Sequence, residues 1–279
     1  MPGPVVVCEP RDAALLARLL AGIRTGAPVV VLDPTWPAPL RASVVTDVEV
    51  AVSEGRVGTG DLVLPTSGSA GRPRAVVRSA ASWDASLGPL SQVTGITGGD
   101  VVWLPGPLTS TLSLYGAWHA TALGARVLLR DDDPAAATVV HTVPSVLAAL
   151  AADATRVPSL RTVVVAGDRL PPPSRAAAQE HGWNVLEYYG AAELSFVAHR
   201  RDDGAFTSFP AVAVEVRDGV IWVRSPYLSR GYVAADGPWR LASGWALSGR
   251  AARASLLSCA CVCAPTIRKA GSCASAITI

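Results

Sequence analysis

The chain has 279 residues, half of them apolar and 16% charged, and its net charge is +2 at pH 7. This composition excludes an intrinsically disordered protein, because disordered chains have too little apolar surface to offset their conformational entropy. The balance of 24 basic against 22 acidic residues also argues against a nucleic-acid partner, which requires a basic patch. The length predicts about two domains, or one large one.

A composition this rich in apolar residues could include a membrane-spanning helix. The longest stretch without a charged residue lies between Asp100 and Arg126, and prolines and glycines break it near its start. A spanning helix needs about 20 predominantly apolar residues in a row, so we expect no membrane span. The segment Met1–Asp12 lacks the basic start of a signal peptide. We therefore expect a cytoplasmic protein.

The first elements along the chain are a strand, a helix and a second strand. Runs of β-branched residues predict strands at Val5–Val7 and Val29–Leu32. Between them, apolar residues at helical spacing predict a helix that begins at Asp12 and ends before Gly26. This order is a βαβ unit and predicts two parallel strands. Residues 35–60 are less regular, with a short strand expected at Val44–Val52.

The same alternation continues to residue 188. Further strands are predicted at Leu62–Leu64, Ala75–Arg78, Val101–Leu104, Ala125–Leu129, Val139–Val143, Thr162–Val165 and Val185–Tyr188. Further helices are predicted from Ser79 or Ser82 to Gly95, at Leu112–Leu123, from Pro144 to about Ala151 and at residues 174–181. The alternation predicts an α/β fold with mostly parallel sheets flanked by helices. After residue 205, a predicted hairpin of Val212–Val216 and Val220–Val223 indicates a small β subdomain.

One loop has the composition of a phosphate-binding loop. Residues 66–74 read T-S-G-S-A-G-R-P-R and directly follow an apolar strand. Small residues allow backbone N–H groups to approach an anion closely, and Arg74 adds a full charge at the end of the loop. The loop lacks the G-K-S/T of a Walker A motif. On these residues alone, an ordinary Gly/Ser-rich surface turn explains the segment equally well.

A second loop, Tyr188–Glu193, follows another strand that is expected to be parallel. Ligands bind at the carboxyl ends of strands in open α/β sheets. An aromatic ring here can stack on a base, and Glu193 can hold Mg²⁺, which prefers carboxylates together with substrate phosphates. Taken alone, the segment is also compatible with an ordinary loop at a strand end.

Together and in this order, the two loops resemble signatures of the adenylate-forming superfamily, which includes acyl-CoA synthetases, luciferases and peptide-synthetase adenylation domains. Residues 66–75 read T-S-G-S-A-G-R-P-R-A against T-S-G-S/T-T-G-x-P-K-G, and residues 189–193 read Y-G-A-A-E against Y-G-x-T-E. Residues 163–170 (VVVAGDRL) and 219–232 (GVIWVRSPYLSRGY) resemble two further signatures. The resemblance covers roughly residues 60–250 and is strongest to compact acyl-CoA ligases of the o-succinylbenzoate–CoA ligase type.

This resemblance implies an AMP-forming acid–CoA ligase. A carboxylic acid would be activated with ATP and Mg²⁺ to an acyl-adenylate, and the thiol of CoA, or of an acyl carrier, would then displace AMP. The catalytic pair would be Glu193, which also holds the metal, and Arg74. The segment Leu108–His119 would help to line the acyl pocket, although a lone histidine is more often a buried helix residue. The other residues that would contact the nucleotide are Thr66, Ser67, Gly68, Ser69, Gly71, Gly167, Asp168, Tyr189, Gly190 and Ala192.

The sequence also departs from the family pattern. Arg74 stands where the family has Lys, Ala75 where it has Gly, and Ala192 where it has a Thr whose hydroxyl contacts the α-phosphate. The family's ribose-binding Asp has no counterpart at residues 243–245 or 248–250. A non-catalytic remnant that binds an adenylate or an acyl group is therefore a second interpretation, and an α/β domain for another phosphorylated ligand is a third.

These patterns divide the chain into three regions. Residues 1–204 are expected to be the α/β AMP-binding core, 205–250 the β-hairpin subdomain, and 251–279 an irregular tail. Four of the five cysteines lie in the tail, and their spacing is not that of a zinc site. The tail contains no strand–turn–helix pattern, so we interpret it as out of frame or truncated. The family's mobile C-terminal domain is then missing.

Overall fold

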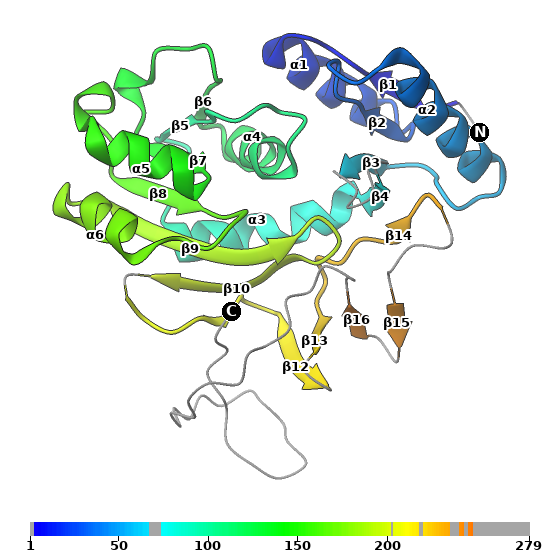
Figure 1. Cartoon of the computed structure of the whole chain (residues 1–279). Helices are drawn as coiled ribbons and strands as arrows, with labels where there is room; N and C mark the ends of the chain where they lie inside the picture. The colour runs from blue at the N-terminus through cyan, green and yellow to red at the C-terminus, as the bar shows by residue number, and fades with distance from the viewer. Residues whose placement is uncertain are drawn as a thin grey trace.

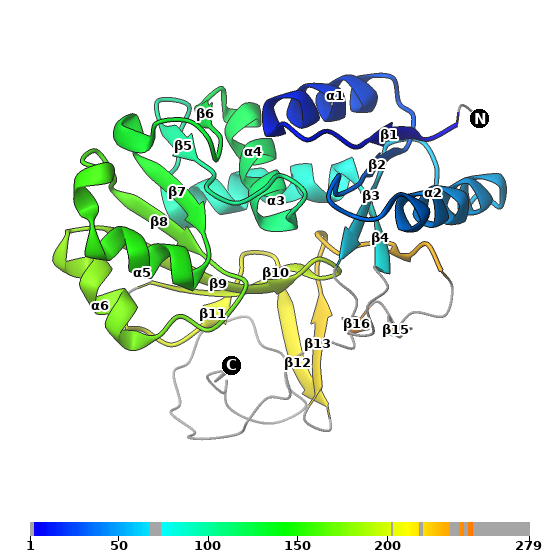
Figure 2. The ribbon, with the colours of Figure 1, turned by 45° about the horizontal axis from the view of Figure 1, so that its top comes forward.

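Strands with apolar side chains on both faces build two large sheets, and helices cover each face. The computed structural model describes residues 3–66, 74–201, 203–217, 220–234, 240–242 and 245–247. Figures 1 and 2 show the two sheets side by side, with helices between them and on their outer faces. The result is a mixed α/β architecture, as the sequence predicts.

The first sheet has the strand order β1-β2-β3-β4-β14. Its β1–β2 and β2–β3 pairs are parallel, whereas β4 pairs antiparallel with both β3 and β14. The parallel pair that the βαβ pattern predicts is therefore confirmed. The bounds are β1 Val5–Val7, β2 Val29–Val31, β3 Asp61–Thr66, β4 Arg74–Ser79 and β14 Gly231–Tyr232.

The second sheet has the order β11-β10-β9-β8-β7-β5-β6. Every pair from β9 to β6 is parallel, and β10 and β11 add antiparallel strands at one edge. The bounds are β5 Val101–Trp103, β6 Arg126–Leu128, β7 Val139–Thr142, β8 Thr162–Val165, β9 Asn184–Ala191, β10 Ser195–Arg201 and β11 Thr207–Ser208.

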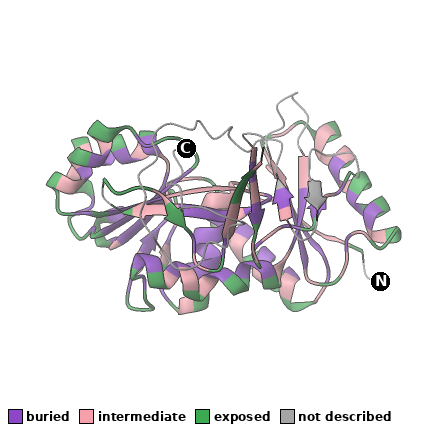
Figure 3. Ribbon diagram, turned by 90° about the horizontal axis from the view of Figure 1, so that it is seen from below, coloured by how far each residue is buried: buried purple, intermediate pink, exposed green. Residues whose placement is uncertain are grey.

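Successive side chains of a strand point to opposite faces of its sheet, and each apolar face is covered by helices. In β2, Val29 and Val31 face the core between the two sheets, and Val30 faces the opposite side. Helices α1, α3 and α4 fill the space between the sheets, α2 covers the outer face of the first sheet, and α5 and α6 cover that of the second. Figure 3 shows the same order as buried strands beneath helices with exposed outer faces. The bounds are α1 Asp12–Arg24, α2 Ala38–Ser53, α3 Ala80–Thr94, α4 Thr111–Leu123, α5 Pro144–Ala152 and α6 Pro172–Glu180.

A small antiparallel sheet near the end of the chain has the order β12-β13-β16-β15. It contains the expected hairpin, and Ile221 and Val223 of β13 join the core between the large sheets. The bounds are β12 Ala213–Arg217, β13 Val220–Arg224, β15 Arg240–Ala242 and β16 Trp245–Leu247. Beyond residue 204, β11 and β14 pair with the two large sheets instead, so the division at that residue stays a prediction.

Two expectations for local structure are wrong. The segment Val44–Val52 is part of helix α2 and not a strand, because Val44, Val48 and Ala51 lie on one helical face and are buried. The Tyr188–Glu193 segment is mostly strand, because β9 continues to Ala191 and pairs with β10. No helix within the described ranges is long and apolar enough to cross a membrane.

A buried ion cluster fixes helix α6 to the second sheet. Glu187 of β9 accepts hydrogen bonds from Arg175 of α6 and, at 2.7 Å, from Arg200 of β10. The side chains of Glu187 and Arg175 are 5% and 3% exposed. Removal of one partner from such a cluster leaves a buried charge without compensation.

We expect Glu187→Gln to lower the free energy of unfolding by about 3–5 kcal/mol, because Arg175 and Arg200 then lose their shared counter-charge. Urea unfolding followed by circular dichroism measures this change. Glu54→Gln is the matched control, because Glu54 forms an exposed pair with Arg56 and such pairs contribute little. Equal unfolding midpoints for the two variants would contradict the prediction.

Candidate nucleotide and metal site

The two ends of the first candidate loop are held side by side by strand pairing. Thr66, the last residue of β3, pairs with Arg74, the first residue of β4. The Thr66 hydroxyl donates to the Arg74 carbonyl at 3.2 Å. Four of the predicted phosphate-binding residues lie outside the described residues: Ser67, Gly68, Ser69 and Gly71.

The second candidate segment is a tight strand-to-strand turn. Gly190 pairs with Phe196, and a Cβ atom at Gly190 would lie 2.1 Å from the carbonyl oxygen of Ser195. Only glycine fits there, so Gly190 has a structural reason for its identity. Ser195 has a φ of 60°, which completes the turn after Glu193.

Glu193 is held at both its backbone and its side chain. The residue is 3% exposed, and its carbonyl accepts a hydrogen bond from the Ser229 N–H at 2.8 Å. Its carboxylate Oε1 accepts a hydrogen bond from the Tyr232 hydroxyl at 2.5 Å. These contacts fix a buried carboxylate beside the edge strand β14.

Tyr232 also brings Glu193 close to Arg74. Tyr232 pairs with Val76 of β4, and Arg74 lies two residues from Val76 on the same face of that strand. Burial and the Glu193 carboxylate raise the pKa of Tyr232 well above its usual range, while the Arg74 guanidinium acts in the opposite direction. Arg74, Tyr232 and Glu193 therefore form one charged and polar cluster.

Arg78 anchors the turn that carries Glu193. This fully buried side chain donates to the carbonyls of Ala192 and Tyr227, each at 2.7 Å, and to the Ser82 hydroxyl at 3.0 Å. Burial lowers its pKa to about 10, and Tyr115 and Glu193 oppose this shift. Arg78 is therefore still protonated at neutral pH.

The residues expected on the adenine side follow strand β8. Val165 of β8 pairs with Glu187 of β9, so Gly167 and Tyr189 lie at the same edge of the sheet, two residues further on. Gly167 has a φ of 95°, which favours glycine, and both Gly167 and Asp168 are exposed. Tyr189 is half-buried. The site thus has an exposed strand-end loop next to the buried Glu193.

The donor set fits a magnesium ion that arrives with a nucleotide. Within the described ranges, no group of three or more His, Cys, Asp or Glu side chains could hold a metal ion alone. Mg²⁺ in nucleotide enzymes is commonly held by one or two carboxylates plus substrate phosphates. Glu193 supplies one carboxylate, with one of its oxygens already fixed by Tyr232.

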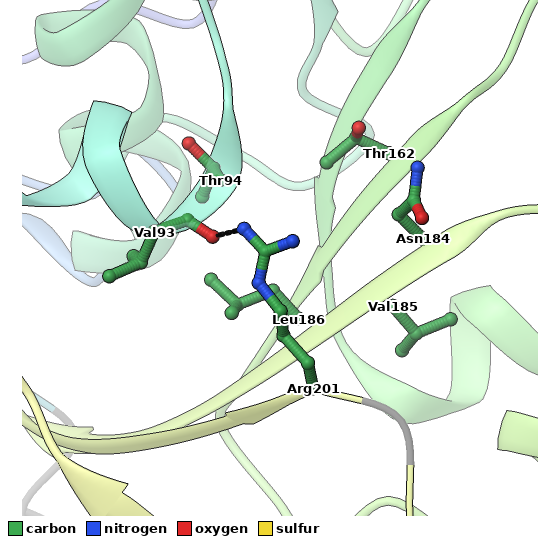
Figure 4. Close-up of a pocket in the computed structure, with 7 residues that line it drawn as sticks. All are labelled: Val93, Thr94, Thr162, Asn184, Val185, Leu186 and Arg201. Atoms are coloured by element: carbon green, nitrogen blue, oxygen red, sulfur yellow. Dashed lines mark hydrogen bonds between the residues drawn. The ribbon is translucent and has the colours of Figure 1, made fainter.

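The hollow drawn in Figure 4 belongs to another part of the fold. Thr162 and Asn184 begin β8 and β9, so it lies at the end of the sheet opposite the Tyr189–Glu193 turn. Its volume of about 20 Å³ admits about one water molecule. Arg201 is one of its lining residues and donates to the Val93 carbonyl. We therefore assign the site from the residue cluster and not from this hollow.

Helix α4, which includes most of the expected acyl-pocket segment, is buried from Ser113 to Ala120. His119 is fully buried, and its Nε2 lies 2.9 Å from the Ser91 hydroxyl. Burial lowers the pKa of His119 to about 4 and that of the neighbouring His141 to about 3. The interpretation of His119 as a buried helix residue agrees with this geometry.

Sequence reasoning assigned no role to Tyr232 and Arg78. Tyr232 is the last residue of the signature at residues 219–232. The sequence shows this motif but not the contact between Tyr232 and Glu193. Arg78 is the one charged residue of the predicted strand Ala75–Arg78, and a charge buried in a strand needs partners. That pattern was the available signal for Arg78.

Comparison with known proteins identifies the family. The model of the AMP-binding enzyme family matches residues 62–233, and the chain belongs to this family. An uncharacterized acyl-CoA ligase of Bacillus subtilis, YhfT, is 33% identical over 204 residues, which cover 62% of this chain and 42% of YhfT. The chain thus matches less than half the length of that relative.

Solved structures share the fold at low sequence identity. O-succinylbenzoate coenzyme A synthetase (MenE) of Bacillus subtilis in complex with ATP and magnesium aligns with a TM-score of 0.72 and 18% identity, over 88% of this chain and 66% of MenE. VinN in complex with L-aspartate aligns with a TM-score of 0.69 and 20% identity, over 84% of this chain and 78% of VinN. The fold class and the family predicted from the sequence are confirmed.

We expect acid to destabilise the protein through His119 and His141. Their pKa values in the folded state lie below the ordinary value of 6.5, so the unfolded state binds more protons and stability falls as the pH drops below about 6.5. Each histidine contributes about 1.4 kcal/mol per pH unit within this window. The loss from His119 ends near pH 4.

Unfolding free energies of wild type and His119→Gln, measured in urea between pH 7.5 and 4.5, test this expectation. The glutamine amide can still bond to Ser91 but does not titrate, so the variant should show the shallower pH dependence. Parallel curves for the two proteins would contradict the prediction, whatever their offset at pH 7.5.

Proposed function

We propose that this chain carries the nucleotide and acid site of an AMP-forming acid–CoA ligase that works in the cytoplasm. The observation that carries the proposal is the buried Glu193, joined through Tyr232 to Arg74 at the end of the phosphate-loop segment. Family membership supports adenylate chemistry. The names of YhfT and MenE support an acyl-CoA ligase in particular.

In the proposed reaction, a carboxylate oxygen attacks the α-phosphorus of ATP, and the bond to pyrophosphate breaks. A thiol sulfur, of CoA or of an acyl carrier, then attacks the acyl carbon, and AMP leaves. Magnesium would neutralise phosphate charge during the first step. Such reactions depend mainly on position and on charge neutralisation by the surrounding groups.

The residues of the chain would divide these tasks. Arg74 faces the terminal phosphates, and Glu193 holds the metal. The Tyr189 ring stacks on adenine, and Gly167 and Asp168 line the adenine side. The remaining contacts to the nucleotide come from Thr66, Ser67, Gly68, Ser69, Gly71, Gly190 and Ala192.

The substrate is a small carboxylic acid. MenE and VinN share the fold. MenE is named as an o-succinylbenzoate coenzyme A synthetase, and VinN was solved with L-aspartate, so the fold accommodates acids of different polarity. We place the acid next to the segment Leu108–His119, at the start of the buried helix α4. Buried aromatic rings such as Tyr115 and Phe196 pack there at a centroid distance of 5.0 Å and favour an acid of limited size.

ATP–pyrophosphate exchange with a panel of carboxylic acids tests the proposal. Label that enters ATP only in the presence of one class of acid supports adenylate formation, and subsequent release of a CoA thioester supports the second step. ATP or AMP binding without exchange for any acid would favour a non-catalytic adenylate-binding protein, which the alanine at position 192 also suits.

We expect Glu193→Gln to weaken Mg²⁺-dependent binding of ATP by about 10-fold or more, because the metal loses its carboxylate ligand. AMP binding without Mg²⁺ should be nearly unchanged. Calorimetric titration with each nucleotide measures both effects. Equal losses for ATP and AMP would instead identify Glu193 as a structural residue.

A further inference from the structure

The segment 227–232 holds both the backbone and the side chain of Glu193. The Ser229 N–H binds the Glu193 carbonyl at 2.8 Å, and the Tyr232 hydroxyl binds Oε1 at 2.5 Å. The Tyr227 carbonyl shares Arg78 with the Ala192 carbonyl, each at 2.7 Å. The backbone and the side chain of the acid are therefore both set by a segment almost 40 residues away.

The position of Tyr232 is itself determined by strand pairing. Gly231 and Tyr232 form β14, which pairs antiparallel with Val77 and Val76 of β4. The Arg230 N–H binds the Val77 carbonyl, and the Val233 N–H binds the Ala75 carbonyl, each at 2.8 Å. These bonds fix the backbone of Tyr232, whose hydroxyl contacts Glu193.

We propose that Tyr232 is a positioning residue for Glu193: its hydroxyl holds Oε1, so that the second carboxylate oxygen serves as the ligand for nucleotide-bound magnesium. This inference rests on the proposed function, because it assigns the metal to Glu193. A carboxylate already fixed by a hydrogen bond loses less side-chain entropy when it binds a metal. Hydrogen-bond partners of metal ligands commonly contribute 10- to 100-fold to metal affinity.

The same hydroxyl links the metal ligand to the phosphate loop. Arg74 lies at the end of that loop and also interacts with the Tyr232 hydroxyl. The chain of contacts runs from Arg74 through Tyr232 to Glu193, so the cation for the terminal phosphates and the ligand for the metal share one support.

Tyr232→Phe in the full chain tests the role of the hydroxyl. We expect the variant to need about 10-fold more Mg²⁺ than wild type for half-maximal ATP binding, with AMP binding in EDTA unchanged. Tyr227→Phe is the matched control: it removes a phenol hydroxyl from the same segment, but that group donates to the Pro210 carbonyl at 2.8 Å and not to Glu193. This control should keep the Mg²⁺ dependence of wild type.

The double variant Glu193→Gln with Tyr232→Phe separates a role through Glu193 from a general one. The double variant should bind ATP with the same Mg²⁺ dependence as Glu193→Gln alone, because Tyr232 then has no metal ligand to position. Additive losses, or an equal loss of AMP binding in Tyr232→Phe, would overturn the inference. So would a Tyr232→Phe protein that matches wild type while Glu193→Gln is impaired, and in that case the proposed function stands. If wild-type ATP binding does not depend on Mg²⁺ at all, the metal role of Glu193 and this inference both fail.

Discussion

The buried guanidinium of Arg78 is the interaction on which the arrangement of the site depends. Arg78 lies on β4 of the first sheet, and it binds the Ala192 carbonyl, after β9 of the second sheet, and the Tyr227 carbonyl, between β13 and β14. One side chain thus joins the two large sheets and the segment that connects β13 to β14. Desolvation of this charge is costly, and it is offset only while both carbonyls stay in place. If the guanidinium were lost, two carbonyls at the sheet junction would lack a partner, and each such loss costs about 1–3 kcal/mol. The same contact that closes the fold therefore sets the turn that carries Glu193.

This arrangement explains how a loop residue can have a defined position. Loops usually move more than the strands that they connect. Here the turn after β9 is short, and its residues Ala192 and Glu193 are bound by Arg78 and Ser229. At the end of β9, Gly190 lies so close to the Ser195 carbonyl that a Cβ atom would not fit. A carboxylate on such a turn loses little freedom when a cation binds. The candidate phosphate-binding segment is supported in another way: its two ends, Thr66 and Arg74, are paired within strands β3 and β4.

Local patterns in the sequence predicted most of the fold, because apolar strands alternate with helices of regular spacing. The prediction of secondary structure failed where a segment fits both the strand pattern and the helix pattern. Residues 44–52 are rich in β-branched valines, which favour a strand, but burial of Val44, Val48 and Ala51 against the first sheet requires a helix. Strand β10 was missed because its partner β9 was ended too early, at Tyr188. The contact between Tyr232 and Glu193 spans 39 residues and depends on the register of β14 against β4, which no local pattern contains.

The contacts of the turn help to explain two departures from the family signatures, at positions 192 and 74. Ala192 lacks the hydroxyl that the resemblance assigns to the α-phosphate contact, but its carbonyl still binds Arg78, so the turn keeps its shape without that side chain. The substitution therefore leaves the support of the turn in place. Arg74 keeps the positive charge of the family's lysine but replaces a compact ammonium with a planar guanidinium that has donors on several sides. A guanidinium can donate to the Tyr232 hydroxyl with one nitrogen and to a phosphate with another. A compact ammonium is less suited to two such partners. The chain has therefore kept a positive charge at position 74 and the backbone support of the turn that carries Glu193, while it departs from the family signatures at two positions that the resemblance places at the nucleotide.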